Sequence, residues 1–332
     1  MSTIVGHDAT LDVGQQQSAN SCNEMIQLSA DVAGNMTVEE GFWSDWVPLG
    51  HSLGRMMIRN RSSSASLVRS FRPGADSELP VATAKAVLHD YLHASINLEL
   101  LYTLWKNCDK RFAEIASEFN GVRLLRQDPI ECLFSFICSS NNHISRITMM
   151  LRRLREMYGN PIVIVDGVTY RAFPTICSLA NVKESELREL GFGYRAKFIK
   201  QTALTLHKER AVDFLYSLRG KSMEEIRIEL CKFVGVGRKV ADCVALFSLD
   251  QHHVVPVDTH IGQIAMRHYH QHLAGLKLAS KSLSDKVYGQ ISSMFIDVFG
   301  ERAGWAHSIL FTSDLAMFRK TSGVPPKKKR CL

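Results

Sequence analysis

Two side chains in the second half of the chain could together do chemistry on a sugar. Lys239 lies near the start of an apolar-periodic segment, directly after the turn Gly235-Val236-Gly237. Asp258 follows within Pro256-Val257-Asp258-Thr259-His260 and places a carboxylate at the start of another segment. A lysine near a helix start, with cations around it and partial burial, is less inclined to hold its charge, so a nucleophilic amine becomes available. That amine could displace a base from a sugar carbon and leave a Schiff base, while the carboxylate stabilises developing positive charge or relays a proton.

The glycine turn itself predicts a site for a phosphate. Glycine reaches positive φ without steric cost, so Gly235 and Gly237 can form a tight turn between two helices. The first N–H groups of the second helix have no partner within that helix and favour an anion, for which phosphate is the first candidate. We therefore expect a helix–hairpin–helix that grips a DNA backbone. From the residues alone, a simpler alternative stays open, in which Lys239 only contacts a phosphate and Asp258 only caps a helix.

The composition is compatible with a polyanionic partner. The chain has 332 residues and a formal net charge of +7, from 40 Lys and Arg against 33 Asp and Glu. This excess is mild, and a basic protein without such a partner fits it equally well. The eight cysteines are scattered without a C-x-x-C pair, which favours buried free thiols in a reducing compartment over disulfides or a zinc site. We find no apolar run that could span a membrane, and no secretory or mitochondrial leader pattern at the N-terminus.

The composition and the hydrophobic pattern of the sequence change at two points along the chain. Residues 1–78 hold short apolar runs and end in a Ser- and Pro-rich break over 60–80, which predicts a small β-containing or partly disordered region. Residues 79–320 show apolar positions at three- and four-residue spacing, which predicts a mainly α core. Residues 321–332 form a basic tail with Lys327, Lys328, Lys329 and Arg330, which suits a nuclear import signal or, as the alternative, a solubilising tail.

Local signals place the helices of the core. Asp128-Pro129 predicts a strong helix start, and Ser222-Met223-Glu224-Glu225 is a capping box that begins the first helix of the hairpin. Arg152, Arg153 and Arg155 are expected on a solvated helix face. Helices are expected over 81–92, 98–119, 130–139, 144–158, 184–190, 196–207, 211–218, 259–269, 284–299 and 301–318, with a short hairpin or loop over 162–170.

Residues 80–318 resemble the helix–hairpin–helix DNA glycosylase superfamily, and in particular the eukaryotic 8-oxoguanine DNA glycosylases. The resemblance implies a mainly α helix–hairpin–helix core and an enzyme that flips an oxidised guanine out of DNA, since the target bond is inaccessible in a stacked duplex. The enzyme would cut the N-glycosidic bond and nick the backbone by β-elimination. It would act as a monomer without a cofactor on double-stranded DNA that contains an oxidised purine or an abasic site, in the nucleus, with the mitochondrion left open. The matching stretches are Gly121–Pro129, Glu131–Asn142, Gly193–Ala196, Gly235–Cys243, Val255–His260 and Gly304–Ala306.

The same resemblance implies a role for individual residues. Lys239 matches the Schiff-base lysine and Asp258 the catalytic aspartate. The base pocket is expected at Cys243, Phe311, His307, Phe136 and Phe247. DNA contacts are expected from Asn141, which fills the gap of the flipped base, from the wedge Tyr194, from the cytosine-reading Arg146 and Arg195, from the phosphate contact His260, and from Gly235, Gly237 and Val240. No metal is required, although a hairpin cation at the carbonyls of Cys231, Phe233 and Gly235 is an option.

Three departures from the family pattern bear on the substrate. His307 stands where the family has a glutamine that bonds the base edge, and Phe247 replaces a methionine. The N-terminal segment Gly14-Gln15-Gln16-Gln17-Ser18 lacks the aromatic pair of the family's base-sensing Gly-Gln-Ser-Phe-Arg-Trp. The first hypothesis is therefore removal of 8-oxoguanine opposite cytosine with lyase activity. Its alternatives are the same fold acting on a different damaged base, and a non-catalytic binder of DNA lesions.

Overall fold

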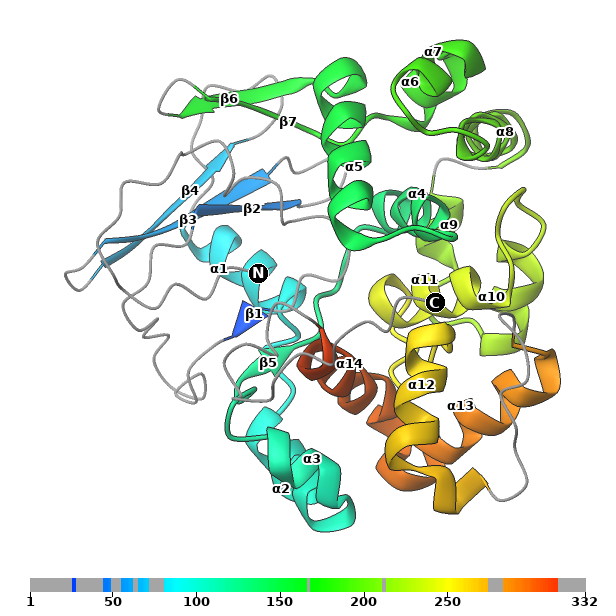
Figure 1. Ribbon diagram of the computed structural model, residues 1–332. Coiled ribbons are helices and arrows are strands. Elements are labelled where there is room, and N and C mark those ends of the chain that lie inside the picture. Colours follow the sequence, from blue (N-terminus) through cyan, green and yellow to red (C-terminus); the bar gives the residue numbers. More distant parts are fainter. Residues whose placement is uncertain are drawn as a thin grey trace, which may run out of the picture. The chain divides into compact units, whose positions relative to one another are not determined.

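The computed structural model describes residues 81–165, 168–210, 213–273 and 283–315, together with four strands nearer the N-terminus (Figure 1). The segment 14–18 and the basic tail from Lys327 to Arg330 lie outside the described residues. The chain divides into two compact units, which are described separately. The first unit comprises residues 1–97 and 123–251, and the second comprises residues 98–122 and 252–332.

Three of the N-terminal strands form an antiparallel sheet. β2 (Ser44–Pro48) pairs with β3 (Arg55–Arg61), which pairs with β4 (Ala65–Phe71); β1 is the short strand Ile26–Gln27. The expected β content of this region is confirmed. The break expected over 60–80 is wrong in part, because β4 lies within it and pairs along its whole length with β3. Such cross-strand pairing outweighs the weak strand preference of the serines.

One buried helix occupies the centre of the first unit. Helix α4 (Pro129–Ser139) begins at Asp128, whose carboxylate accepts hydrogen bonds from the N–H groups of Ile130 and Glu131. The predicted start at Asp128-Pro129 is confirmed. Helix α4 packs against α5 (Ile144–Tyr158), α8 (Arg195–Glu209) and α11 (Arg238–Ser248), all visible in Figure 1. The remaining elements of the first unit are α1 (Val81–Tyr91), β6 (Pro161–Val165), β7 (Val168–Arg171), α6 (Ile176–Asn181), α7 (Glu184–Glu189), α9 (Phe214–Ser217) and α10 (Met223–Leu230).

Helices α10 and α11 form the expected hairpin. The capping box at the start of α10 is present: Ser222 Oγ accepts from the Glu225 N–H, and the Glu225 carboxylate accepts from the Ser222 N–H. Arg227 on α10 donates through Nε to Asp242 on α11 at 2.7 Å, and the Asp242 side chain is fully buried. A buried carboxylate is strongly destabilised without such a partner, so this ion pair holds the two helices together.

An aromatic core fills the second unit. Trp105 and Phe112 lie edge to face with ring centroids 5.3 Å apart, and Tyr269 donates to Asp109 at 3.0 Å. Burial, and then the Asp109 charge, raises the pKa of Tyr269. The elements that carry this core are α2 (Leu98–Cys108), α3 (Lys110–Ile115), α12 (Thr259–His268), the 3₁₀ turn η2 (His270–Leu273), α13 (Asp285–Phe299), the 3₁₀ turn η3 (Gly300–Arg302) and α14 (Ala303–Asp314), with β5 (Val122–Arg123) spanning the boundary between the units in sequence.

Some predicted helix boundaries are wrong. The continuous helix expected over 98–119 is two helices, because the Asp109 carboxylate accepts from the Phe112 N–H and begins α3 as an N-cap. The helix expected from 301 begins as a 3₁₀ turn after Gly300, whose φ is +71°. The helix expected over 211–218 is described only over Phe214–Ser217. Helix α6 was not expected, although Thr175 caps its first turn.

The cysteines in the described parts of the chain lie both in the interior and at the surface. The six described cysteines carry free thiols, of which Cys132, Cys138 and Cys243 are buried. The expectation of burial is wrong for the exposed Cys108, Cys177 and Cys231. Among the described helices, none combines the length and the apolar character needed to cross a bilayer.

Candidate active site and nucleic-acid interface

The two hairpin glycines adopt different conformations. Gly235 has φ of +84°, and a Cβ placed on it would lie 2.4 Å from Cδ2 of Phe198, so both backbone and space require glycine there. Gly237 is the N-cap of α11 and is extended, with φ of −102° and ψ of −177°. The expected positive φ is thus confirmed for Gly235 and wrong for Gly237. Among the described residues other than its chain neighbours, no atom would lie within 4 Å of a Cβ on Gly237, so packing against them does not explain the glycine.

Lys239 lies on the first turn of α11 beside two stacked rings. Its Nζ is 5.3 Å from the ring centroid of Phe136 on α4. Phe136 stacks on Phe247 with centroids 5.4 Å apart and an interplanar angle of 20°. Because Lys239, Cys243 and Phe247 follow at four-residue spacing, they share one face of α11. The structure therefore brings Lys239, Phe136 and Phe247 together. Cys243, which is buried, lies on α11 between Lys239 and Phe247.

A second cluster joins the predicted DNA-contacting residues of the first unit. The Tyr194 hydroxyl donates to the Ser140 carbonyl at 2.9 Å, and Arg195 donates to the same carbonyl through Nε at 3.1 Å. Arg195 Nη2 also donates to the Asn141 carbonyl at 3.0 Å. Asn141 has φ of +47°, a conformation that asparagine tolerates better than most residues. Asn141, Tyr194 and Arg195 are thus neighbours, and the carbonyl of Ser140, which we had not predicted, accepts from both Tyr194 and Arg195.

The environment of this cluster differs from one side chain to the next. Tyr194 is 45% exposed, whereas Arg195 is only 3% exposed and lies with its guanidinium 4.5 Å from the Tyr194 ring centroid. Burial raises the pKa of the Cys138 thiol at the end of α4 to about 12, although the Arg195 charge acts in the opposite direction. Cys138 is therefore a neutral thiol at physiological pH, and the cluster presents a tyrosine ring at the surface above a buried cation.

The arginines of α5 form a third group. Arg146 donates through Nη2 to the Gly191 carbonyl at 3.2 Å, and Arg153 donates through Nη1 to the Leu190 carbonyl at 2.9 Å. Arg155 pairs with Glu131 of α4, and both of these side chains are largely buried. The expected solvated face is confirmed only for Arg152, which pairs with Glu156 at the surface. The signal that we missed was the end of α7 at Leu190 followed by Gly191, where carbonyls without a partner in the helix accept from Arg153 and Arg146.

In the second unit, Asp258 is the N-cap of α12. Its Oδ1 accepts from the N–H groups of His260 at 3.0 Å and Ile261 at 2.9 Å. The capping function expected in the simpler alternative is therefore present. The cap uses only Oδ1, so Oδ2 is not committed to it. Asp258 belongs to the second unit and Lys239 to the first.

His260 and Phe311 are neighbours in the second unit. Their rings meet edge to face with centroids 5.0 Å apart. His260 Nε2 lies 3.1 Å from Asp314 Oδ2, an ion pair when the ring is protonated, and Arg267 pairs with the other Asp314 oxygen at 2.8 Å. His307 is 5% exposed and its ring meets Phe295 edge to face at 6.1 Å. The structure thus places His307 against the aromatic core of this unit.

One carbonyl of the hairpin turn could contribute to the suggested cation site. The Phe233 carbonyl accepts from the Val236 N–H at 3.1 Å, which leaves this oxygen a second lone pair for a cation. The suggested hairpin cation is compatible with this carbonyl and stays a prediction.

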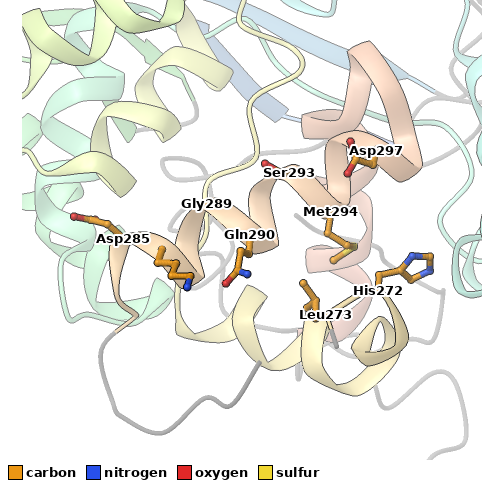
Figure 2. A pocket seen from close by; sticks show the side chains of 9 residues that line it. His272, Leu273, Asp285, Gly289, Gln290, Ser293, Met294 and Asp297 are labelled. Atoms are coloured by element: carbon orange, nitrogen blue, oxygen red, sulfur yellow. The ribbon is translucent and has the colours of Figure 1, made fainter. Parts of the chain in front are cut away.

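A hollow of about 540 Å³ lies between η2 and α13 (Figure 2). None of the predicted site residues is among the described residues that line it, which are His272, Leu273, Asp285, Lys286, Gly289, Gln290, Ser293, Met294 and Asp297.

The mainly α fold and the glycine hairpin that opens α11 define a helix–hairpin–helix protein. Residues 134–283 match the model of the HhH-GPD superfamily of base excision DNA repair proteins, and residues 11–133 match the N-terminal domain of 8-oxoguanine DNA glycosylase. The N-glycosylase/DNA lyase of Saccharomyces cerevisiae is 38% identical over 267 residues, which are 74% of this chain and 70% of the yeast protein. The chain belongs to the 8-oxoguanine DNA glycosylase family.

Further relatives agree with this assignment. The N-glycosylase/DNA lyase OGG1 of Arabidopsis thaliana is 43% identical over 235 residues, which are 70% of this chain but only 63% of the length of the plant protein. Among solved structures, MBOgg1 in complex with a low-affinity DNA ligand superposes with a TM-score of 0.64 at 26% identity, covering 86% of this chain and 91% of that one. The Clostridium acetobutylicum 8-oxoguanine glycosylase/lyase, in complex with double-stranded DNA containing cytosine opposite 8-oxoguanine, gives 0.63 at 26% identity, covering 84% and 89%.

Proposed function

We propose that this protein is a base-excision-repair DNA glycosylase with AP lyase activity that removes 8-oxoguanine paired with cytosine. The observation that carries the proposal is the position of Lys239, on the first turn of α11 directly behind the glycine hairpin of a family member. An amine at this place lies beside the helix start that would bind the DNA backbone. The lysine therefore has the chemistry of a nucleophile and a position next to the strand.

The proposed reaction proceeds through a covalent intermediate. The neutral Lys239 amine attacks C1′ of the flipped nucleotide, the bond from C1′ to the base breaks, and the base leaves with the electron pair and takes up a proton. Asp258 is assigned the stabilisation of positive charge that develops on the sugar. The attached nitrogen then loses a proton, its lone pair breaks the bond from C1′ to O4′, and O4′ takes up a proton, which gives a ring-opened iminium. Loss of a proton from C2′ forms the double bond from C2′ to C3′ and breaks the bond from C3′ to the 3′ phosphate, which leaves with the electron pair. Hydrolysis of the imine releases the lysine.

The proposal gives the hairpin the task of holding the DNA backbone. The N–H groups at the start of α11 point to a bound phosphate, because a helix N-terminus favours an anion. Gly237 supports this assignment, since no atom of the described residues beyond its chain neighbours lies within 4 Å of a Cβ placed there, and a close phosphate would need that space. Val240 and His260 are assigned further backbone contacts.

Lesion recognition is assigned to the residues around Ser140 in the first unit and to the base pocket. Asn141 would fill the gap of the flipped base, Tyr194 would wedge beside the orphaned cytosine, and Arg146 and Arg195 would read that cytosine. Tyr194 and Arg195 contact the segment that carries Asn141, which supports a shared task. The pocket residues assigned to the extruded base are Cys243, Phe136, Phe247, His307 and Phe311.

Partner and location follow from the same proposal. The substrate is double-stranded DNA with an oxidised purine or an abasic site, acted on by a monomer without a cofactor. Nuclear import would use Lys327, Lys328, Lys329 and Arg330, and a mitochondrial form stays open. A fusion of residues 321–332 to a fluorescent reporter tests the import signal, because a reporter that stays evenly distributed contradicts it.

Borohydride trapping tests the activity. Borohydride reduces a lysine–sugar imine, so the protein should form a covalent adduct with a duplex that carries 8-oxoguanine opposite cytosine. Lys239→Gln should form no adduct and should lose more than about a hundredfold in strand nicking. Adducts only with other damaged bases would instead support the alternative substrate. Binding of the lesion without any adduct or base release would contradict the enzymatic proposal and support a lesion-binding protein.

A further inference from the structure

Two loops of the first unit carry the residues that the proposed function assigns to the orphaned cytosine. The first loop, residues 140–142, follows α4 and contains Asn141. The second loop, residues 190–194, precedes α8 and ends at Tyr194. The Tyr194 hydroxyl and the Arg195 guanidinium both donate to the Ser140 carbonyl, so the position of the second loop determines how the first is held.

Helix α5 holds the second loop from the other side. Arg153 donates to the Leu190 carbonyl at 2.9 Å, and Leu190 is the C-cap of α7, where helix carbonyls lack a partner within the helix. Arg146 donates to the next carbonyl, that of Gly191, at 3.2 Å. Gly191 has φ of +89°, and a Cβ placed on it would lie 3.2 Å from Nη1 of Arg153. The guanidinium therefore lies directly against the turn of the loop.

The two arginines differ in what they can do when DNA binds. Arg146 is exposed, and the proposed function requires its guanidinium to turn towards the cytosine, which removes one of the two hydrogen bonds to the loop. Arg153 is half-buried and sits two helical turns further along α5. A hydrogen bond from a charged donor is roughly twice as strong as a neutral one, and Arg153 keeps such a bond to the Leu190 carbonyl when Arg146 turns away.

We propose that Arg153 is a positioning residue for recognition of the base opposite the lesion. It acts through the second loop, which it fixes at Leu190 so that Tyr194 and Arg195 keep their places. This inference rests on the proposed function, because it assigns a consequence to the same interface. It also predicts that loss of Arg153 affects the choice of opposite base more than the chemistry at Lys239.

The chain contains a matched control one residue away. Arg152 is also on α5, carries the same charge and pairs with Glu156 at 3.6 Å on the surface. Exposed pairs of this kind contribute little to stability. Arg152→Met and Arg153→Met thus make the same chemical change, and only the second removes a hydrogen bond to the loop.

The experiment compares excision of 8-oxoguanine opposite cytosine and opposite adenine, as a ratio of kcat/KM values. Arg153→Met should lower the cytosine-to-adenine ratio about tenfold, the value expected for one charged hydrogen bond. Arg152→Met should leave the ratio unchanged. Arg153→Lys should keep most of it, because an ammonium can still donate to one carbonyl. The ratio is independent of the fraction of folded protein, so a general loss of stability does not alter it.

Two results would overturn the inference. One is an Arg153→Met variant that slows both duplexes equally and keeps the wild-type ratio. The other is a Gly191→Ala variant that keeps the wild-type ratio, although the substitution strains the same turn and brings a Cβ against the Arg153 guanidinium. A wild-type protein that cuts neither duplex would refute the proposed function. Arg153 would then be tested by the ratio of Kd values for an abasic analogue opposite cytosine and adenine, which should fall in the same way.

Discussion

At the scale of single residues, Lys239 has an aromatic neighbour that matters for its orientation. Its ammonium lies over the Phe136 ring, which is in turn backed by Phe247. An aromatic face attracts a cation by roughly 0.5–2 kcal/mol, enough to select one orientation of a flexible side chain. We infer that the pair orients the nucleophile.

Removal of the ring should slow the chemistry and leave the binding of an undamaged duplex, which places no base in the pocket, unchanged. Phe136→Leu should lower the single-turnover rate of base release and of borohydride trapping about threefold to thirtyfold, because the amine loses the ring that restricts its orientation towards the reacting carbon. The matched control is Phe134→Leu on the same helix, since Phe134 is fully buried and faces Phe173 at 6.1 Å instead. Both variants lose core packing. Equal slowing of the two variants in single-turnover assays would show that the Lys239 contact is irrelevant.

At the scale of elements, the hairpin depends on an ion pair that crosses from α10 to α11. Asp242 is fully buried, while Arg227 is 28% exposed. The start of α11 carries Gly237 and Lys239, so any tilt of this helix moves the phosphate site and the nucleophile together. The ion pair between Arg227 and Asp242 therefore contributes both to the stability of the protein and to the position of Gly237 and Lys239. The surface ion pairs of the same region do not position these residues.

The loss of Arg227 should destabilise the protein measurably. Arg227→Met should lower the free energy of unfolding by about 2–4 kcal/mol, less than for a fully buried pair because the guanidinium is partly exposed. Urea denaturation gives this value directly. Lys232→Met provides the comparison, since Lys232 pairs with Glu229 at the surface at 2.6 Å and should contribute less than about 1 kcal/mol. A similar loss in the two variants would contradict the special importance of the buried pair.

At the scale of the whole molecule, the net charge of +7 suggests a modest electrostatic contribution to DNA binding. About three cation–phosphate contacts would lower the affinity for an undamaged duplex about 40-fold between 50 and 200 mM salt. Fluorescence anisotropy at several salt concentrations gives the slope. Gly237→Ala should weaken binding and leave this slope unchanged, because backbone N–H groups release no counterions. A constant affinity across the salt range would contradict a phosphate-binding surface.

The parts of the fold that could be predicted are those with strong local signals. Asp128-Pro129 and the capping box at Ser222 act within one helical turn, and both mark the starts that the structure has. The break at Asp109 escaped prediction because the apolar spacing continues past it, and β4 because its partner β3 supplies the stability. Within the site, residue types pointed to Lys239 and Asp258. The tasks of Ser140 and Arg153 depend on contacts between distant segments, which no spacing pattern contains.

The contact of Phe198 with the hairpin has a consequence for how the protein would search a duplex. The Phe198 ring packs against Gly235 on one side and meets Tyr194 edge to face at 5.5 Å on the other. In the proposed function, Phe198 would therefore connect the part that holds the strand to the part that probes the base stack. The protein would then test a base at a constant number of nucleotides from the bound phosphate.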